Sequence, residues 1–241
     1  MMHFLITRPQ PDAAPMAERL KEAGHQCTLS PLLKLSYRQP QGLTPGDAQG
    51  LIFTSRNALR ALAEEAVLQQ LTGLPVFLVG PKLTAYAKQL GFRNIRYNAE
   101  NAEELCHHII DKCQPEDGIL HYLTGTHLAF DMEKLLSESG FKIERTILYS
   151  ADPVDDFTPE AIANIQSGSI HAVILLSPRT ARRYAELILK DNLKANICQS
   201  THYCLSQNVA DELQPLGECM AEIAAAAHMD ALFSMIERKK T

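Results

Sequence analysis

Hydroxyl-bearing residues follow short apolar runs in this chain, at positions where they could bind an anion. Thr54 and Ser55 come directly after the apolar residues 51–53 and precede a run with helical periodicity. A strand that ends in such a turn before a helix is typical of parallel α/β sheets, where ligands bind at the carboxyl ends of strands. The unpaired N–H groups and the dipole of a helix start favour a negatively charged ligand there.

The same arrangement recurs along the chain. Ser177 follows the apolar residues 173–176 as Ser55 follows residues 51–53. The polar turns at predicted strand ends are Thr7-Arg8, Thr54-Ser55, Gly80, Thr124-Gly125, Ser177 and Ser206. Helix capping alone accounts for most single turns of this kind, because Ser, Thr and Gly are common caps. Their repetition indicates instead a surface that binds several carboxylates or phosphates.

Apolar periodicity predicts the elements that must position these turns. The predicted strands cover residues 4–6, 26–30, 51–53, 76–79, 95–97, 119–123, 142–150, 173–176 and 202–205. The predicted helices cover residues 12–23, 83–90, 102–112, 160–166, 209–213 and 229–238, with one more from residue 56 and one between residues 126 and 139. Asp12 and Asn101 are the expected helix caps. Residues 31–50, rich in Pro and Gly, and residues 152–158 indicate linkers or crossings between domains.

The two halves of the chain match one another in order and spacing. The matched segments are Ile6-Thr7-Arg8 with Leu123-Thr124-Gly125, Phe53-Thr54-Ser55 with Leu175-Leu176-Ser177, and Val79-Gly80 with Leu205-Ser206. Similar composition alone would not preserve this order, so we infer an internal duplication that gives two α/β lobes. Lobes that faced each other would surround a cleft rich in N–H and O–H donors.

Composition and charge exclude several classes of protein. The 241 residues are 46% hydrophobic and 21% charged, and the net charge of −5 argues against binding to nucleic acid. The sequence contains no membrane-spanning run and no signal peptide, so we expect a cytoplasmic protein. Its six cysteines include no C-x-x-C pair, and Cys106, His107, His108 and Cys113 are interpreted as buried thiols and surface histidines rather than a metal site.

Several catalytic motifs are absent from the sequence. It contains no G-x-x-x-x-G-K-[ST] and no G-x-G-x-x-G, which argues against ATP or dinucleotide chemistry. It contains no G-x-S-x-G, which argues against a Ser-His-Asp hydrolase. The missing motifs therefore argue against these two kinds of chemistry.

Taken in order, the motifs resemble those of the uroporphyrinogen-III synthase family. They are ITRP near the N-terminus, IFTSRNA, VG followed by Thr84-Ala85, LTG, ILY ending at Tyr149, and LLSP. The resemblance implies two flavodoxin-like lobes with parallel sheets, joined by a two-stranded connector. It implies a discontinuous lobe from residues 1–33 and 153–241, an inserted lobe from residues 38–149, and connectors at about residues 34–37 and 150–152.

The resemblance also implies a reaction. The family cyclises hydroxymethylbilane with loss of water and inversion of the terminal pyrrole ring through a spiro intermediate, without a cofactor. Tyr149 matches the candidate proton donor, although a half-buried strand residue at the connector explains it equally well. The expected substrate-binding residues are Thr7, Arg8, Thr54, Ser55, Gly80, Lys82, Thr84, Thr124, Gly125, Ser177, Thr180, Ser206 and Asn208. A monomer that receives its substrate transiently from hydroxymethylbilane synthase is expected.

One departure from the family pattern stands in the second half. Where the family has a G-x-x-T-A turn, this chain has Ser206-Gln207-Asn208-Val209-Ala210, so the threonine is missing. Ser206 and Asn208 are candidate donors in its place. The alternative function is a non-catalytic, two-lobed binding protein for a tetrapyrrole or another anion, which needs the same cleft but no role for Tyr149.

Overall fold

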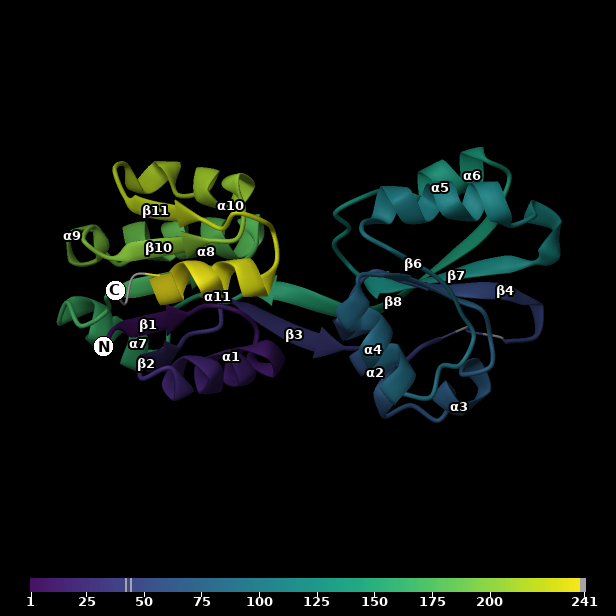
Figure 1. Cartoon of the computed structure of the whole chain (residues 1–241), viewed down its shortest axis with the longest axis horizontal. Helices are drawn as coiled ribbons and strands as arrows, with labels where there is room; N and C mark the ends of the chain where they lie inside the picture. The colour runs from purple at the N-terminus through teal and green to yellow at the C-terminus, as the bar shows by residue number, and fades with distance from the viewer. Residues whose placement is uncertain (42, 44, 239–241) are drawn as a thin grey trace. The chain divides into compact units, whose positions relative to one another are not determined.

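The computed structural model describes residues 1–41, 43 and 45–238, and the chain divides into two α/β units. Unit 1 comprises Met1–Lys34 and Asp152–Thr241, and unit 2 comprises Leu35–Ala151. In each unit, helices cover both faces of a sheet (Figure 1). Each unit is therefore a flavodoxin-like lobe with its own sheet and its own cores.

Unit 1 is built on a parallel sheet in the order β11-β10-β9-β1-β2. Its strands are β1 (His3–Ile6), β2 (Gln26–Leu29), β9 (Ala172–Leu175), β10 (Thr201–Cys204) and β11 (Met220–Ile223). Its helices are α1 (Gln10–Glu22), α7 (Pro159–Gln166), α8 (Pro178–Lys190), α9 (Lys194–Ile197), α10 (Gln207–Asp211) and α11 (Met229–Arg238), with the short helix η3 (Gln214–Leu216).

Two hydrophobic cores hold unit 1 together, one on each face of its sheet. The helices α7 to α10 supply apolar side chains to one core, which includes the fully buried Tyr184. The helices α1 and α11 pack over the other face, around Phe4 and Ile6. The central strand β9 is buried along its whole length, which explains its continuous apolar run.

Unit 2 is built on a sheet in the order β3-β8-β7-β4-β5-β6, in which β4 to β8 pair in parallel. Its strands are β3 (Leu33–Tyr37), β4 (Ala48–Phe53), β5 (Val76–Val79), β6 (Ile95–Ala99), β7 (Ile119–Gly125) and β8 (Lys142–Pro153). Its helices are α2 (Arg56–Ala63), α3 (Leu68–Leu71), α4 (Pro81–Gln89), α5 (Ala102–Lys112) and α6 (Met132–Glu138), with the short helices η1 (Pro45–Asp47) and η2 (Pro115–Asp117).

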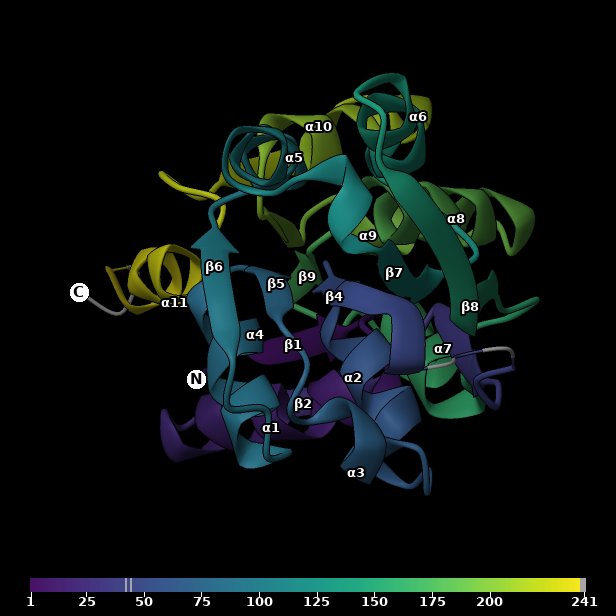
Figure 2. The same ribbon diagram turned by 90° about the vertical axis from the view of Figure 1, so that its right-hand side faces the viewer.

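The helices of unit 2 also divide between the two faces of their sheet. Helices α2, α3 and α4 pack on one face around Phe53 and Leu123, and α5 and α6 pack on the other around Ile52 and Tyr122. Figure 2 shows the strands of this unit side by side in the order of the sheet, from β6 at one edge to β8 near the other. The chain passes between the units within β3 and β8, which are neighbours in the sheet and form the two-stranded connector.

The two sheets have the same strand order when each strand is replaced by its counterpart in the duplication. In unit 1 the turn-bearing strands run in the order β1, β9, β10, and in unit 2 their counterparts run β7, β4, β5. The remaining strands also correspond, with β2 matching β8 and β11 matching β6. Each unit therefore contains strands from both halves of the duplicated sequence.

Some local predictions were wrong or incomplete. Helix α1 begins at Gln10 after Pro9, and Asp12 lies inside its first turn, where it pairs with Arg8 instead of capping the helix. The helix expected soon after Thr126 begins at Met132 because Asp131, whose carboxylate accepts from Lys134 N, is its cap. The strands predicted from apolar periodicity omitted β3 and β11, although the family resemblance implied a connector strand at about residues 34–37, within β3. Asn101 caps α5 as expected.

Candidate active site

The polar turns of unit 2 lie together at the carboxyl edge of its sheet. Strand β4 lies between β5 and β7, and Phe53 is in register with Leu78 on one side and Leu123 on the other. The residues that follow these positions therefore occupy neighbouring strand ends. They are Thr54, Ser55, Gly80, Thr124 and Gly125, with Lys82 and Thr84 in the first turn of α4.

The hydroxyl groups of this edge have different partners. Thr54 Oγ1 shares a hydrogen bond of 3.2 Å with the phenol of Tyr122. Ser55 caps α2, where its Oγ accepts from Asn57 N at 3.2 Å. Thr84 Oγ1 lies 2.9 Å from Asn98 Oδ1, to which it donates. Part of the predicted donor set is thus engaged in building the turns, as the capping interpretation requires.

Gly80 has a backbone conformation that favours glycine. Its φ is +90°, in the region that residues with a side chain rarely adopt. Its N–H donates to the carbonyl of Ala99, and helix α4 begins directly afterwards at Pro81. The position therefore turns the chain sharply from β5 into α4, and Lys82 is exposed in the first turn of that helix.

Tyr149 lies at the same edge, directly against Gly125. The two residues are paired between β8 and β7, after a register shift that leaves Leu148 as an extra residue on β8. A Cβ added to Gly125 would lie 2.6–3.0 Å from Cζ, Cε1 and Cε2 of the Tyr149 ring. The ring therefore occupies the space that a side chain at Gly125 would fill.

An arginine that carries no sequence signal fixes the turn beside Tyr149. Arg145 donates through Nη2 to the carbonyls of Gly125 at 3.1 Å and Thr126 at 3.0 Å. Its Nη1 pairs with Glu133 at 3.4 Å, and Thr126 N donates to the carbonyl of Tyr149 at 3.0 Å. Sequence reasoning missed Arg145, because its role depends on the register between β7 and β8.

The polar turns of unit 1 follow neighbouring strands in the same way. Ser177 caps α8 and also shares a 2.8 Å hydrogen bond with the hydroxyl of Thr180, which is buried. Thr7 is 1% exposed, and its hydroxyl donates to the carbonyl of Ile174 across the β1–β9 pair. Arg8 forms an ion pair with Asp12 at 3.2 Å. These contacts hold the strand ends of β1 and β9 in place.

The turn after β10 differs from the others. Ser206 precedes α10 but makes no side-chain capping hydrogen bond, and Asn208 is exposed in the first turn of the helix. This is the turn that departs from the expected G-x-x-T-A pattern. Its hydroxyl and amide groups are half-buried or exposed.

The most strongly perturbed titratable groups lie inside unit 1. Tyr184 Oη and His202 Nε2 lie 3.0 Å apart, and both residues are 0% exposed. Burial lowers the pKa of His202 to about 4 and raises the pKa of Tyr184 well above its ordinary value. Both groups are neutral at pH 7, so this pair contributes to the core rather than to acid–base chemistry at the edge.

The part of the chain that the structure describes contains no group of three His, Cys, Asp or Glu side chains that could hold a metal ion. Within the same residues, every helix is too short or too polar to cross a bilayer.

Comparisons with known proteins identify a single family. A family model for uroporphyrinogen-III synthase HemD matches residues 14–234. The uroporphyrinogen-III synthetase structure from Helicobacter pylori 26695 is 18% identical, with a TM-score of 0.67 over 99% of this chain and 100% of that chain. A mutant uroporphyrinogen III synthase from the extremely thermophilic bacterium Thermus thermophilus is 13% identical, with a TM-score of 0.58 over 100% of both chains. These two structures support the fold. Curated proteins give no significant match.

Proposed function

The chain belongs to the uroporphyrinogen-III synthase family, whose members are cyclases of haem biosynthesis, and we propose that it is a lyase. Its proposed reaction closes hydroxymethylbilane into a ring. The reaction removes water and inverts the terminal pyrrole ring. The observation that carries this proposal is the Tyr149 ring packed on Gly125 at the carboxyl edge of unit 2. A phenol holds its proton at pH 7, since its ordinary pKa is about 10, and can donate it to a leaving hydroxyl.

The proposed step balances without a co-reactant. The phenol of Tyr149 gives its proton to the substrate hydroxyl as the C–O bond breaks, and water leaves. The substituted carbon of the terminal ring then attacks the electron-poor methylene carbon and forms the spiro intermediate. The bond between the spiro carbon and the methylene that linked this ring to the rest of the bilane then breaks, and that methylene carbon bonds to the other α-carbon of the same ring, on the far side of the ring nitrogen. The proton that the ring finally loses restores the phenol.

Arg145 serves this step as a positioning residue. It holds the carbonyls of Gly125 and Thr126, and Thr126 in turn donates to the carbonyl of Tyr149. The guanidinium group thereby fixes the turn on which the phenol rests. A fixed phenol matters because general acid catalysis requires the donor to lie within hydrogen-bond reach of the leaving oxygen.

The substrate carries eight carboxylates, and we propose that the turns at the carboxyl edges of both units bind them. Hydroxyl groups and main-chain N–H groups near helix starts suit carboxylates, and the helix dipoles add to the attraction. The proposed substrate-binding residues are Thr7, Arg8, Thr54, Ser55, Gly80, Lys82, Thr84, Thr124, Gly125, Ser177, Thr180, Ser206 and Asn208. Ser206 and Asn208 replace the missing threonine as donors.

Product analysis tests the function directly. The protein is incubated with freshly generated hydroxymethylbilane, and the oxidised products are separated by chromatography. The expected product is the type III isomer, because the enzyme must invert the terminal ring. Formation of the type I isomer alone, at the rate seen without protein, would contradict catalysis. Saturable binding of the type III product with no catalysis would support a non-catalytic tetrapyrrole-binding protein.

We further propose that the protein acts as a monomer in the cytoplasm and receives its substrate from hydroxymethylbilane synthase. Both sets of binding turns belong to one chain, so the proposed chemistry needs no second copy. A transient hand-over would shorten the time that the labile substrate spends in water. The test is an assay in which hydroxymethylbilane synthase generates the substrate in the presence of this protein. A reagent that captures free hydroxymethylbilane should then reduce type III formation less than it reduces spontaneous type I formation.

A further inference from the structure

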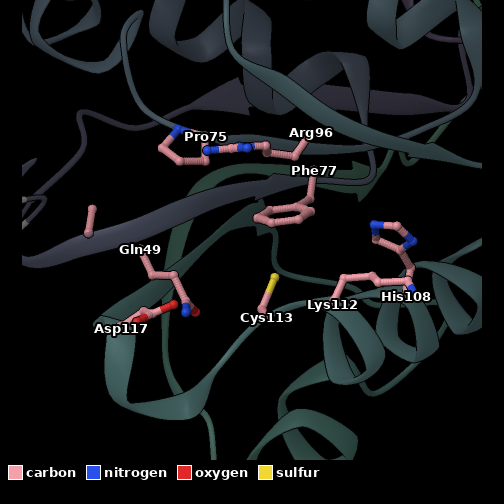
Figure 3. Close-up of a pocket in the computed structure, with 9 residues that line it drawn as sticks. Gln49, Pro75, Phe77, Arg96, His108, Lys112, Cys113 and Asp117 are labelled. Atoms are coloured by element: carbon pink, nitrogen blue, oxygen red, sulfur yellow. The ribbon is translucent and has the colours of Figure 1, made fainter.

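A pocket lies in unit 2 at the opposite edge of the sheet from the proposed substrate turns. It has a volume of about 530 Å³, which is within the usual range for small-molecule sites. Its walls come from the starts of β4, β5 and β6 and from the end of α5 (Figure 3). The amino ends of the strands therefore border it, whereas the proposed substrate turns follow the carboxyl ends.

Two β-bulges supply polar side chains to this pocket. Between β4 and β7, Ala48 pairs with Ile119 and Gly50 with Leu120, so Gln49 is an extra residue. Between β5 and β6, a similar shift leaves Arg96 as an extra residue. Both extra residues line the pocket. A bulge interrupts the regular alternation of side chains and redirects the extra one, and bulges are frequent beside binding sites.

The floor of the pocket is aromatic. A Cβ at Gly50 would lie 2.8 Å from Cε2 of Phe77. The Phe77 ring therefore lies against β4 at Gly50, in the space that a side chain at Gly50 would fill. In Figure 3 the ring lies at the centre of the pocket, between the strand residues and the α5 residues His108 and Lys112. An apolar part of a ligand would contact this ring.

The polar groups around the floor of the pocket are suited to an anion that also carries a hydrogen-bond donor. Arg96 and Lys112 are cationic, and Asp117 is the acidic residue among the lining side chains. Gln49 donates through Nε2 to the carbonyl of Gln114 at 2.6 Å. Its Oε1 is buried and has no hydrogen-bond partner in the described part of the chain, which leaves an acceptor that needs a donor.

We propose that this pocket binds a small organic acid that carries a hydroxyl or ammonium group beside its carboxylate. The carboxylate would pair with Arg96, whose planar fork matches it, and with Lys112. The hydroxyl or ammonium group would donate to Gln49 Oε1, and the carbon skeleton would lie on Phe77. This site is independent of the proposed reaction, because it shares no residue with the substrate-binding turns or with Tyr149.

The half-buried thiol of Cys113 provides a local probe, because it lines the same pocket. The full chain is treated with N-ethylmaleimide at mildly alkaline pH in the presence of increasing L-malate, and modification of each cysteine is measured by peptide mass spectrometry. Malate should slow modification of Cys113 in a saturable manner. The exposed Cys198 in unit 1 is the internal control and should react at an unchanged rate.

Two comparisons locate the binding. Arg96→Gln should weaken malate protection by at least about tenfold. A hydrogen bond to a charged group contributes enough binding free energy to change affinity by this factor. Arg93→Gln removes an exposed arginine of the same unit that does not line the pocket, and protection should remain. Succinate, which lacks the hydroxyl, should protect about fivefold more weakly than malate.

The proposal is overturned if tens of millimolar malate leaves Cys113 unprotected, or if Cys113 and Cys198 are slowed equally. It is also overturned if malate protects Arg96→Gln and Arg93→Gln alike, since malate would then act elsewhere. Equal thermal melting of the three unliganded proteins shows that the variants are folded. None of these readouts depends on type III product, so the outcome is separate from that of the cyclisation assay.

Discussion

At the scale of single residues, the position of the Tyr149 ring depends on a missing side chain. Gly125 provides the space, and the extra residue in β8 brings Tyr149 to it. A tyrosine whose ring is packed on backbone in this way has little rotational freedom, which favours a defined donor position. Substitutions at Tyr149 and at Gly125 separate the chemistry of the phenol from the packing of its ring.

Tyr149→Phe should reduce the rate of type III formation by at least about tenfold. The variant keeps the ring and its packing but removes the proton that the phenol donates, and general acid catalysis contributes about 10²–10⁴-fold. Substrate affinity and melting temperature should change little, because no cavity is created. The rate and the melting temperature are measured on one preparation. A full rate in this variant would show that the bilane cyclises without the phenol.

Gly125→Ala should destabilise unit 2 by about 1–3 kcal/mol, because the new methyl group overlaps the Tyr149 ring. The same substitution in a Tyr149→Ala background should cost much less, since the ring is gone. Urea unfolding of the four proteins of this double-mutant cycle gives the coupling. Additive effects would contradict the packing of Tyr149 on Gly125.

Acid should destabilise unit 1 through His202. Its pKa is lowered from 6.5 to about 4 by burial, so the folded state binds the proton less well than the unfolded state. The stability that depends on neutral His202 is complete above about pH 6.5 and is lost as the pH falls toward 4. The loss amounts to about 3 kcal/mol.

The measurement is the free energy of unfolding between pH 7.5 and pH 4, compared with that of His202→Gln. The glutamine variant keeps a polar side chain but has no titrating group, so its stability should fall less over this range. Other acid-sensitive groups are common to both proteins and cancel in the difference. If the free energy of unfolding fell in parallel with pH in both proteins, His202 would not be the cause of the acid sensitivity.

At the scale of elements, equivalent turns differ in how their hydroxyl groups are used. Ser177 caps α8, whereas Ser206 makes no side-chain capping bond at α10. Ser177→Ala should therefore cost about 1 kcal/mol of stability, the usual value of a cap, and Ser206→Ala should have a much smaller effect. Chemical denaturation measures both. Equal losses would show that capping does not distinguish these two turns.

The buried elements could be predicted from the sequence, and the exposed ones could not. Strand β9 is buried throughout, so its apolar run was evident, and α5 was predicted with its Asn101 cap. Strand β11 is mostly exposed and has no apolar run, so its pairing with β10 is not visible in local periodicity. In β3, Leu33, Leu35 and Tyr37 alternate with polar residues, but the Pro and Gly residues around this strand obscured the signal.

The candidate site follows the same division. Turn residues such as Thr54 and Gly80 could be proposed from the sequence, because their types and their positions after predicted strands are visible there. The contact of Tyr149 with Gly125 and the bonds of Arg145 arise from the register between β7 and β8. Register between strands distant in sequence is set by tertiary packing, so no local pattern revealed these contacts.

At the scale of the whole molecule, the duplication is distributed over both units. The first half of the sequence supplies β1 and β2 to unit 1 and β4 to β6 to unit 2, and the second half supplies β7 and β8 to unit 2 and β9 to β11 to unit 1. Neither half of the sequence forms a complete sheet. The units, rather than the sequence repeats, are therefore the folding domains that we expect.

Matched core substitutions test this expectation. Leu123 and Ile6 are equivalent in the duplication, and both are 0% exposed in the core of their own unit. Leu123→Ala should destabilise unit 2, and Ile6→Ala should destabilise unit 1, each by about 2–5 kcal/mol. Because each unit has its own cores, hydrogen exchange should accelerate in β4–β7 for the first variant and in β1, β9 and β10 for the second. If either substitution accelerated exchange equally in both units, the chain would be one cooperative domain despite its two sheets.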